Sequence, residues 1–199
     1  MTVATENPIT FDAETHTYWR GMAQVPAVSE IMRPLTEQYL RSIPEDILNW
    51  KRDLGIAVHR ACELLDLGEL DEADIDPEIV PYLEGYKRFL VDYQPRWIDI
   101  EQTVFNEAHW YAGTLDRRGL IRGIPTIIDI KTSVAVASYA GIQLWAYAAA
   151  ADSPDAPLAV LQLLKTGDYA LHPFADVARY RAAWHALQTL YRWRKDFSK

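Results

Sequence analysis

Ile127-Ile128-Asp129-Ile130-Lys131-Thr132 places two charged side chains inside an apolar, β-branched stretch. Successive side chains of a β-strand point to opposite faces, so Asp129 and Lys131 share one face while the isoleucines beside them occupy the other. The apolar surroundings predict a largely internal strand, where two charges are costly without a partner such as a metal ion or a phosphate. Taken alone, the same pattern is also typical of a solvated edge strand.

A second acid precedes this strand in Gly113-Thr114-Leu115-Asp116. A glycine followed by a β-branched residue and an acid predicts a strand whose end closely approaches a ligand. Residues 117–125 then allow the chain to reverse, which brings Asp116 and Asp129 together on adjacent strands. Two carboxylates that converge in a partly buried site repel each other unless a cation neutralises them. All-oxygen ligation of this kind suits Mg²⁺ or Mn²⁺, although Asp116 by itself is more typical of a hairpin turn.

The rest of the sequence predicts an α/β fold. Helical spacing alternates with short β-rich segments bounded by turn residues. No internal repeat or low-complexity linker divides the chain. In chain order we expect a hairpin over 9–19, a short helix from Pro26 or Ser29 that Pro34 disturbs, helices over 44–67 and 77–93, strands over 97–105, 111–121 and 126–131, a helix over 137–151, strands over 158–164 and 169–173, and a helix over 176–194.

Two helical segments flank the central strands. His59 closes the segment Gly55-Ile56-Ala57-Val58-His59 and lies among apolar neighbours, where a lone histidine is usually a packing residue. Gln143 and Tyr147 are four residues apart, so they share one helical face. Taken singly, each segment is typical of an ordinary amphipathic helix.

Together, the four pieces resemble the RecB-like branch of the PD-(D/E)XK nuclease superfamily. They are Gly-x-x-x-His, Gly-x-x-Asp, Asp-x-Lys and Gln-x-x-x-Tyr, in this order, and they span roughly residues 55–147, about half of the chain. Residues 11–31 are similar, less specifically, to the opening of small phage-encoded members. The resemblance implies one domain over 1–199, with a hairpin and helix extension over 1–44. Over 45–199 it implies a restriction-endonuclease-like core, a central mixed β-sheet flanked by helices.

The resemblance also implies roles for particular residues. His59, Asp116, Asp129 and the backbone carbonyl of Ile130 are expected to bind Mg²⁺ or Mn²⁺. Lys131 is expected to position or activate the attacking water. Gln143 and Tyr147 are expected to organise the site and the nucleic-acid strand. Some members carry an extra acid on the preceding strand, and Glu101 is the matching candidate, with a surface glutamate as the alternative.

Composition limits the function classes. The single cysteine, Cys62, excludes an internal disulfide, and no iron–sulfur cluster is expected. No apolar run approaches the ~20 residues of a membrane span, and residues 1–8 lack a signal-peptide pattern, so we expect a cytoplasmic protein without membrane contact. The formal net charge of −8 disfavours nucleic-acid binding overall, but Arg192, Arg194 and Lys195 form a basic cluster that could contact phosphates.

The sequence therefore predicts a metal-dependent deoxyribonuclease, of the phage or prophage exonuclease type, that acts on DNA in recombination, replication or repair. A recombinase or single-strand-binding protein is a conceivable partner, and the chain could form an oligomer. Two alternatives remain open. One is a structure-specific or single-strand nuclease. The other is a non-catalytic nucleic-acid-binding or assembly subunit that keeps the fold, although intact Asp116, Asp129 and Lys131 argue against it.

Overall fold

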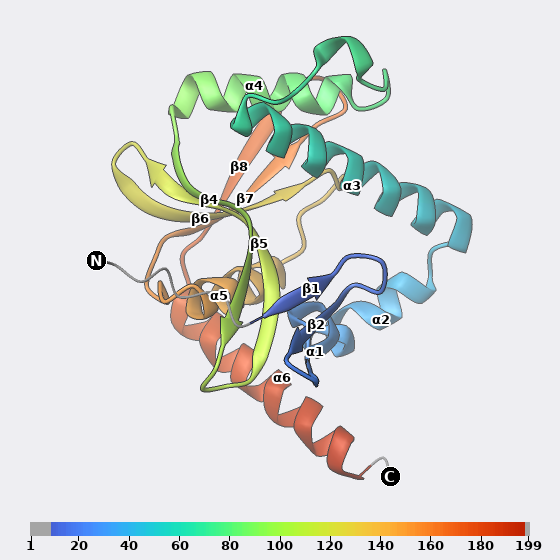
Figure 1. The fold of residues 1–199 in the computed structure, drawn as a ribbon, viewed down its shortest axis with the longest axis vertical. Helices are drawn as coiled ribbons and strands as arrows, with labels where there is room; N and C mark the ends of the chain where they lie inside the picture. The colour runs from blue at the N-terminus through green and yellow to red at the C-terminus, as the bar shows by residue number, and fades with distance from the viewer. Residues whose placement is uncertain (1–8, 198–199) are drawn as a thin grey trace.

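The computed structural model describes residues 9–197, apart from the side chain of Tyr39. Residues 1–8 and 198–199 lie outside the described part. They include the segment that was expected to lack a signal-peptide pattern and the two ends of the expected single domain. A five-stranded mixed sheet occupies the centre, in the order β4-β5-β6-β7-β8 (Figure 1). Strands β6 and β7 run parallel, and the other neighbours run antiparallel. The strands are β4 (Arg96–Asn106), β5 (Tyr111–Ile121), β6 (Ile124–Lys131), β7 (Leu158–Leu163) and β8 (Tyr169–Phe174).

Helices cover both faces of this sheet (Figure 1). On one face lie α3 (Glu45–Leu67) and α4 (Val80–Tyr93), joined through the short 3₁₀ helix η1 (Glu72–Asp74), and on the other lie α5 (Ala140–Ala150) and α6 (Val177–Phe197). The side chains of β6 alternate between the two cores. Ile128 and Ile130 pack with α3 and α4, whereas Ile127 packs with α5 and α6. The predicted α/β class with a mixed central sheet is confirmed.

Local signals set the ends of α3. The helix begins directly after Pro44, and Glu45 and Asp46 lie in its first turn, where negative charge favours the helix dipole. It ends at Gly68, whose φ of +72° is a conformation that glycine adopts without strain. These bounds confirm the helix predicted over 44–67.

The N-terminal segment forms a small sheet and two helices. The predicted hairpin is present as β1 (Thr10–Asp12) and β2 (Thr17–Arg20), and the sequence analysis missed the third strand, β3 (Ala23–Val25). Pro34 does not end the helical region after α1 (Val28–Ile31), because a second helix, α2 (Arg33–Arg41), carries this proline in its first turn, where its missing N–H costs nothing. The segment attaches to β5 through a bridge between Ala27 and Ala112. Among the described residues, no helix is both long and apolar enough to cross a bilayer.

Strand β5 changes sides at Asp116. Before it, Tyr111 and Leu115 pack with α5 and α6. After it, Arg117 contacts α3 and α4, and Ile121 packs in the same core. The strand predicted over 111–121 is confirmed as β5, and the chain reverses within the expected segment 117–125. The turn itself is confined to residues 122–123, and residues 117–121 still pair with β6.

Arg117 anchors this second half of β5 inside the protein. Its side chain is fully buried, and its Nε donates to Asp66 Oδ2 at 2.7 Å and to the Tyr86 hydroxyl at 3.3 Å. Asp66 also accepts from the Tyr86 hydroxyl at 2.6 Å and from Trp97 Nε1 at 3.1 Å. A buried ion pair of this kind is held in one geometry by its hydrogen bonds, and removal of one partner leaves the other charge without compensation.

We expect Arg117→Met to lower the free energy of unfolding by about 3–5 kcal/mol, because Asp66 would remain buried and charged. Adding Asp66→Asn to this variant should recover part of the loss, since it removes the uncompensated charge, and the single amide oxygen can still accept from Trp97 while the amide NH2 donates to the Tyr86 hydroxyl. Arg88→Met is the matched control, because its ion pair with Asp168 is exposed and should contribute less than about 1 kcal/mol. Urea unfolding measures all three, and equal losses for the Arg117 and Arg88 variants would contradict the assignment.

Candidate functional site

Three carboxylates lie in a row across three neighbouring strands. The pairs Ile100↔Arg117 and Gln102↔Leu115 place Glu101 on β4 level with Asp116 on β5. The β5–β6 pairing ends at Arg117↔Ile128, and the next position of that register would place Asp116 level with Asp129. The β4–β5 pairing skips Glu101 and Asp116, and the β5–β6 pairing stops before Asp129, which remains paired with Val160 of β7. The backbone between the three acids is therefore available for other partners.

The backbone of Ile130 shows what replaces the strand pairing. Its N–H donates to Asp116 Oδ2 at 2.7 Å, and its carbonyl accepts from His59 Nε2 at 2.9 Å. A carbonyl can only accept, so Nε2 carries a hydrogen, and the neutral ring keeps its lone pair on Nδ1. Histidines that bind metals commonly donate their other N–H to a carbonyl or carboxylate in this way. Ile130, which was expected to bind metal through its carbonyl, here orients His59.

His59, Glu101 and Asp116 form a group that could hold a metal ion. Nδ1 of His59 lies 3.5 Å from Glu101 Oε1 and 3.7 Å from Asp116 Oδ2. One ligand atom from each residue falls within 4.8 Å of the others. One imidazole nitrogen and two carboxylates suit Mn²⁺ and, with additional water ligands, Mg²⁺. The structure thus brings together the expected residues His59 and Asp116 with Glu101, the additional candidate.

Glu101 is held in a strained conformation. Its φ of +45° is unusual for a non-glycine residue and is exceptional inside a strand. Arg117 Nη1 donates to Glu101 Oε1 at 2.9 Å and to the Asp116 carbonyl at 2.7 Å, which fixes the side chain of one acid and the backbone of the next. A surface glutamate needs neither the strain nor a buried arginine, and this favours a functional role for Glu101.

Asp129 and Lys131 share a face, as expected, but they pair with each other. Lys131 Nζ lies 3.0 Å from Oδ1 and 2.9 Å from Oδ2 of Asp129. Only the contact with Oδ1 has hydrogen-bond geometry, so the buried Oδ2 makes no hydrogen bond with the described residues. In this structure Asp129 contributes no ligand atom to the group formed by His59, Glu101 and Asp116. The Lys131 side chain is 34% exposed, so solvent reaches part of it.

Tyr147 and Gln143 of α5 border the same site. Gln143 Nε2 donates to the Tyr147 hydroxyl at 3.0 Å. Burial holds the pKa of Tyr147 well above its ordinary value, and the charges of Asp129 and Asp116 add to this effect. The hydroxyl therefore stays protonated at neutral pH. Gly113 was interpreted as a site of close ligand approach, but a Cβ at this position would lie 2.5 Å from Tyr147 Cε1, so the glycine makes room for the tyrosine ring.

The electrostatics of the site favour proton uptake without a metal. Burial of the ring opposes its charge, but Asp116 and Glu101 outweigh this effect and raise the pKa of His59 to about 9. Burial raises the pKa of Asp129 to about 6 despite the opposing charge of Lys131. Burial likewise raises the pKa of Asp116, against the stabilising charge of His59. At neutral pH, His59 therefore carries the proton that a metal ion would have to displace.

The expected phosphate-contacting cluster lies on another part of the molecule. Arg192, Arg194 and Lys195 are exposed on the last turns of α6. Arg192 Nη2 donates to the carbonyl of His109 at 2.8 Å, and Lys195 Nζ lies 5.8 Å from the centre of the Tyr191 ring. Arg192 and Lys195 thus have partners within the protein, although both remain solvent-accessible.

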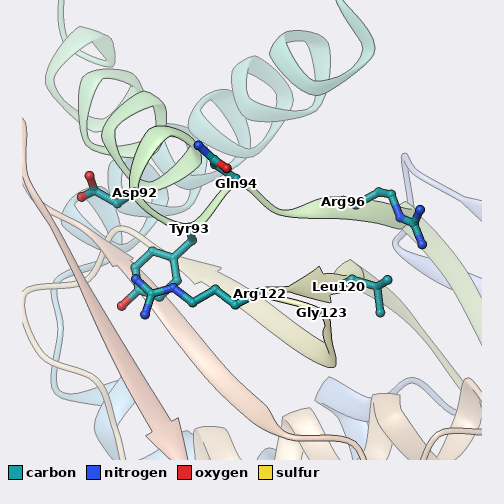
Figure 2. Close-up of a pocket in the computed structure, with 7 residues that line it drawn as sticks. All are labelled: Asp92, Tyr93, Gln94, Arg96, Leu120, Arg122 and Gly123. Carbon is teal, nitrogen blue, oxygen red and sulfur yellow. The ribbon is translucent and has the colours of Figure 1, made fainter.

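A groove of about 440 Å³ lies at the end of α4, beside the β5–β6 turn (Figure 2). Arg122 extends along the Tyr93 ring, 4.6 Å from its centre, and Arg96 lines the same groove. Gln94 ends α4 here, and cations favour the carbonyl end of a helix. None of the predicted site residues lines the groove. We therefore interpret Arg96 and Arg122 as cations that stabilise the end of α4, separate from the group of His59, Glu101 and Asp116.

Sequence reasoning missed Arg117 as a residue of the site. The signal was present, because Arg117 and Arg118 are adjacent in a strand that is apolar on both sides, and at least one must face the interior. Its partner Asp66 could not be identified from spacing alone. Arg118, by contrast, pairs with Asp99 and the carbonyl of Ala151 near the surface.

We expect metal binding to release about one proton per ion at pH 7.5, because His59 must lose its proton to become a ligand. The pKa of about 9 is raised above the ordinary 6.5, so metal affinity should rise by up to tenfold per pH unit and level off near pH 9. Calorimetry in buffers of different ionisation enthalpy measures the released proton. His59→Gln should abolish the pH dependence between pH 7 and 9, and His16→Gln, on the exposed hairpin, should retain it. A flat affinity over this range in the wild type would contradict the protonated state of His59.

No protein-family model matches the chain, and no curated protein matches it in sequence.

Proposed function

We propose that the protein is a metal-dependent nuclease of the RecB-like branch of the PD-(D/E)XK superfamily. The observation that carries the proposal is the convergence of His59, Glu101 and Asp116 where β5 and β6 separate, with Lys131 next to them. The order of the four sequence pieces supports it as well. A divalent ion held by these residues would polarise a scissile phosphate and lower the pKa of a water molecule.

The protein's own residues would supply the remaining functions. Asp116 is fixed by the N–H of Ile130, and Glu101 by Arg117, so the ligand atoms are placed before any ion arrives. Lys131 carries a positive charge on a rigid strand and would position the attacking water or stabilise the charge that develops on the phosphate. Asp129 holds the ammonium group of Lys131 at its present position. Tyr147, with a protonated hydroxyl, would donate a hydrogen bond to the nucleic-acid strand.

The finer assignment is a DNA exonuclease of the phage or prophage type, working in the cytoplasm during recombination, replication or repair. Its support is the resemblance of residues 11–31 to the opening of small phage-encoded members. Tyr18 of this segment packs beside the site, since its hydroxyl lies 2.9 Å from Thr114 Oγ1 on β5. A recombinase or single-strand-binding protein that loads the enzyme, and an oligomeric state, belong to the same proposal.

We expect Asp116→Asn, Glu101→Gln and Lys131→Ala each to reduce Mg²⁺- or Mn²⁺-dependent cleavage by about 100-fold or more, because each removes a charge that the transition state requires. Asp168→Asn is the matched control, since this aspartate is exposed and pairs with Arg88 away from the site. Digestion of end-labelled linear DNA measures the rates, with melting curves to verify folding. Wild-type rates in a folded Asp116 or Lys131 variant would contradict the proposed chemistry.

The same assay separates the finer alternatives. An exonuclease needs an end, so a covalently closed circle should resist cleavage while the same DNA is degraded after linearisation. Nicking of the closed circle at an equal rate would indicate an endonuclease. Binding of DNA without metal-dependent cleavage would indicate a non-catalytic subunit.

A further inference from the structure

Gly55 is a helical glycine that the packing of the protein does not require. A Cβ at this position would meet one atom within 4 Å, Thr132 Oγ1 at 3.9 Å, which is an ordinary contact. The glycines of α4 and α5 are different. A Cβ on Gly85 would lie 2.5 Å from the Asp168 carbonyl oxygen, and one on Gly141 would lie 2.6 Å from Tyr180 Cζ. Glycine inside a helix is less stable than alanine, so Gly55 weakens α3 without improving its packing.

The position of Gly55 connects it to the candidate site. Gly55 and His59 are four residues apart in α3 and lie on the same helical face. Thr132, the neighbour of the missing side chain, directly follows Lys131 at the end of β6. The side chains of His59 and Lys131 are 27% and 34% exposed, so part of the site is open to solvent. The bare backbone at Gly55 thus lies beside the end of β6, next to Thr132.

Lys51 extends this face of α3. It lies four residues before Gly55, about 6 Å further along the helix axis. It is exposed, and among residues 9–197 no ion pair or hydrogen bond engages its ammonium group. Other cations of this helix are paired, as Arg60 is with Glu63 at 2.6 Å. An unpaired cation, a bare backbone and the site histidine therefore follow one another along one line.

We propose that the sugar–phosphate chain of the substrate leaves the site across Gly55 and places a phosphate against Lys51. Glycine allows a ligand to approach the helix backbone more closely than any side chain would permit. The ammonium group of Lys51 then neutralises a phosphate further along the strand, since Lys51 lies about 12 Å from His59 along the helix axis. The inference rests on the proposed nuclease function and names the path of its nucleic-acid strand.

Gly55→Ala and Gly55→Leu test the path, because a side chain at this position should stabilise the helix and at the same time weaken DNA binding. Alanine should raise Tm by about 2–4 °C, because it is the better helix former. It should also raise KM for DNA by about 5-fold or more, because its methyl group occupies the path, and leucine should raise KM further. The Mg²⁺ concentration for half-maximal rate should stay unchanged. Ile56→Ala, at the next and exposed position of α3, is the control and should leave KM unchanged.

Lys51→Ala tests the phosphate contact. With catalysis blocked by Ca²⁺, it should reduce the slope of log affinity against log salt by about 0.7 on single strands or 0.9 on duplex DNA. Arg60→Ala should leave the slope unchanged, because this arginine is paired and lies on another face of the helix.

Two results would overturn the inference. Both Gly55 variants could keep the wild-type KM, which would show that no strand passes there. Alternatively, Tm could fall together with activity, which would show that the glycine is needed for packing. The failure of the proposed function can be distinguished from the failure of this inference. A wild-type protein that neither binds nor cleaves nucleic acid would contradict both the nuclease function and the strand path. An active wild-type protein with unaffected Gly55 variants would contradict only the strand path.

Discussion

The hydrogen bond from the Ile130 N–H to Asp116 Oδ2 determines how the candidate site is built. Strands β5 and β6 separate beyond Arg117↔Ile128, and an unpaired backbone N–H inside the protein would be costly. The Asp116 carboxylate accepts the hydrogen bond from the Ile130 N–H that a paired strand would otherwise accept. His59 Nε2 likewise donates to the Ile130 carbonyl in place of a strand N–H. The separation of two strands thus provides the reason why an acid and a histidine lie side by side in the interior.

The charges around this separation are not balanced within the protein. Asp66 and Glu101 pair with Arg117, and Asp129 pairs with Lys131. Asp116 adds a fourth carboxylate that has no ion pair with either cation and, of these two, feels only the charge of Lys131. A divalent ion would neutralise the two remaining negative charges, whereas a protonated His59 neutralises only one of them. The excess negative charge of Asp116 and Glu101 raises the pKa of His59 to about 9, so the histidine binds a proton in the absence of a metal ion. Proton and metal ion therefore compete for the same negative charge.

The sequence predicted those features that local signals determine. The ends of α3 follow from Pro44 and Gly68, and the opposite faces of Asp129 and Ile130 follow from strand alternation. Features that depend on distant partners could not be predicted. Arg117 and Arg118 look alike locally, yet only Arg117 meets Asp66 across the core, because β5 changes sides at Asp116. The left-handed backbone of Glu101 could not be predicted either, since it accompanies an interruption of the pairing with β5 that no local signal in the sequence marks.

A metal-binding site at the separation of β5 and β6 is the central claim, and anomalous diffraction from crystals soaked in Mn²⁺ tests it most directly. We expect one strong peak within about 2.0–2.3 Å of His59 Nδ1 and of carboxylate oxygens from Glu101 and Asp116. The distance from the peak to Asp129 would show whether this acid leaves Lys131 to join the site. The absence of a peak at this position in crystals grown at pH 8, with Mn²⁺ bound elsewhere or not at all, would contradict the claim.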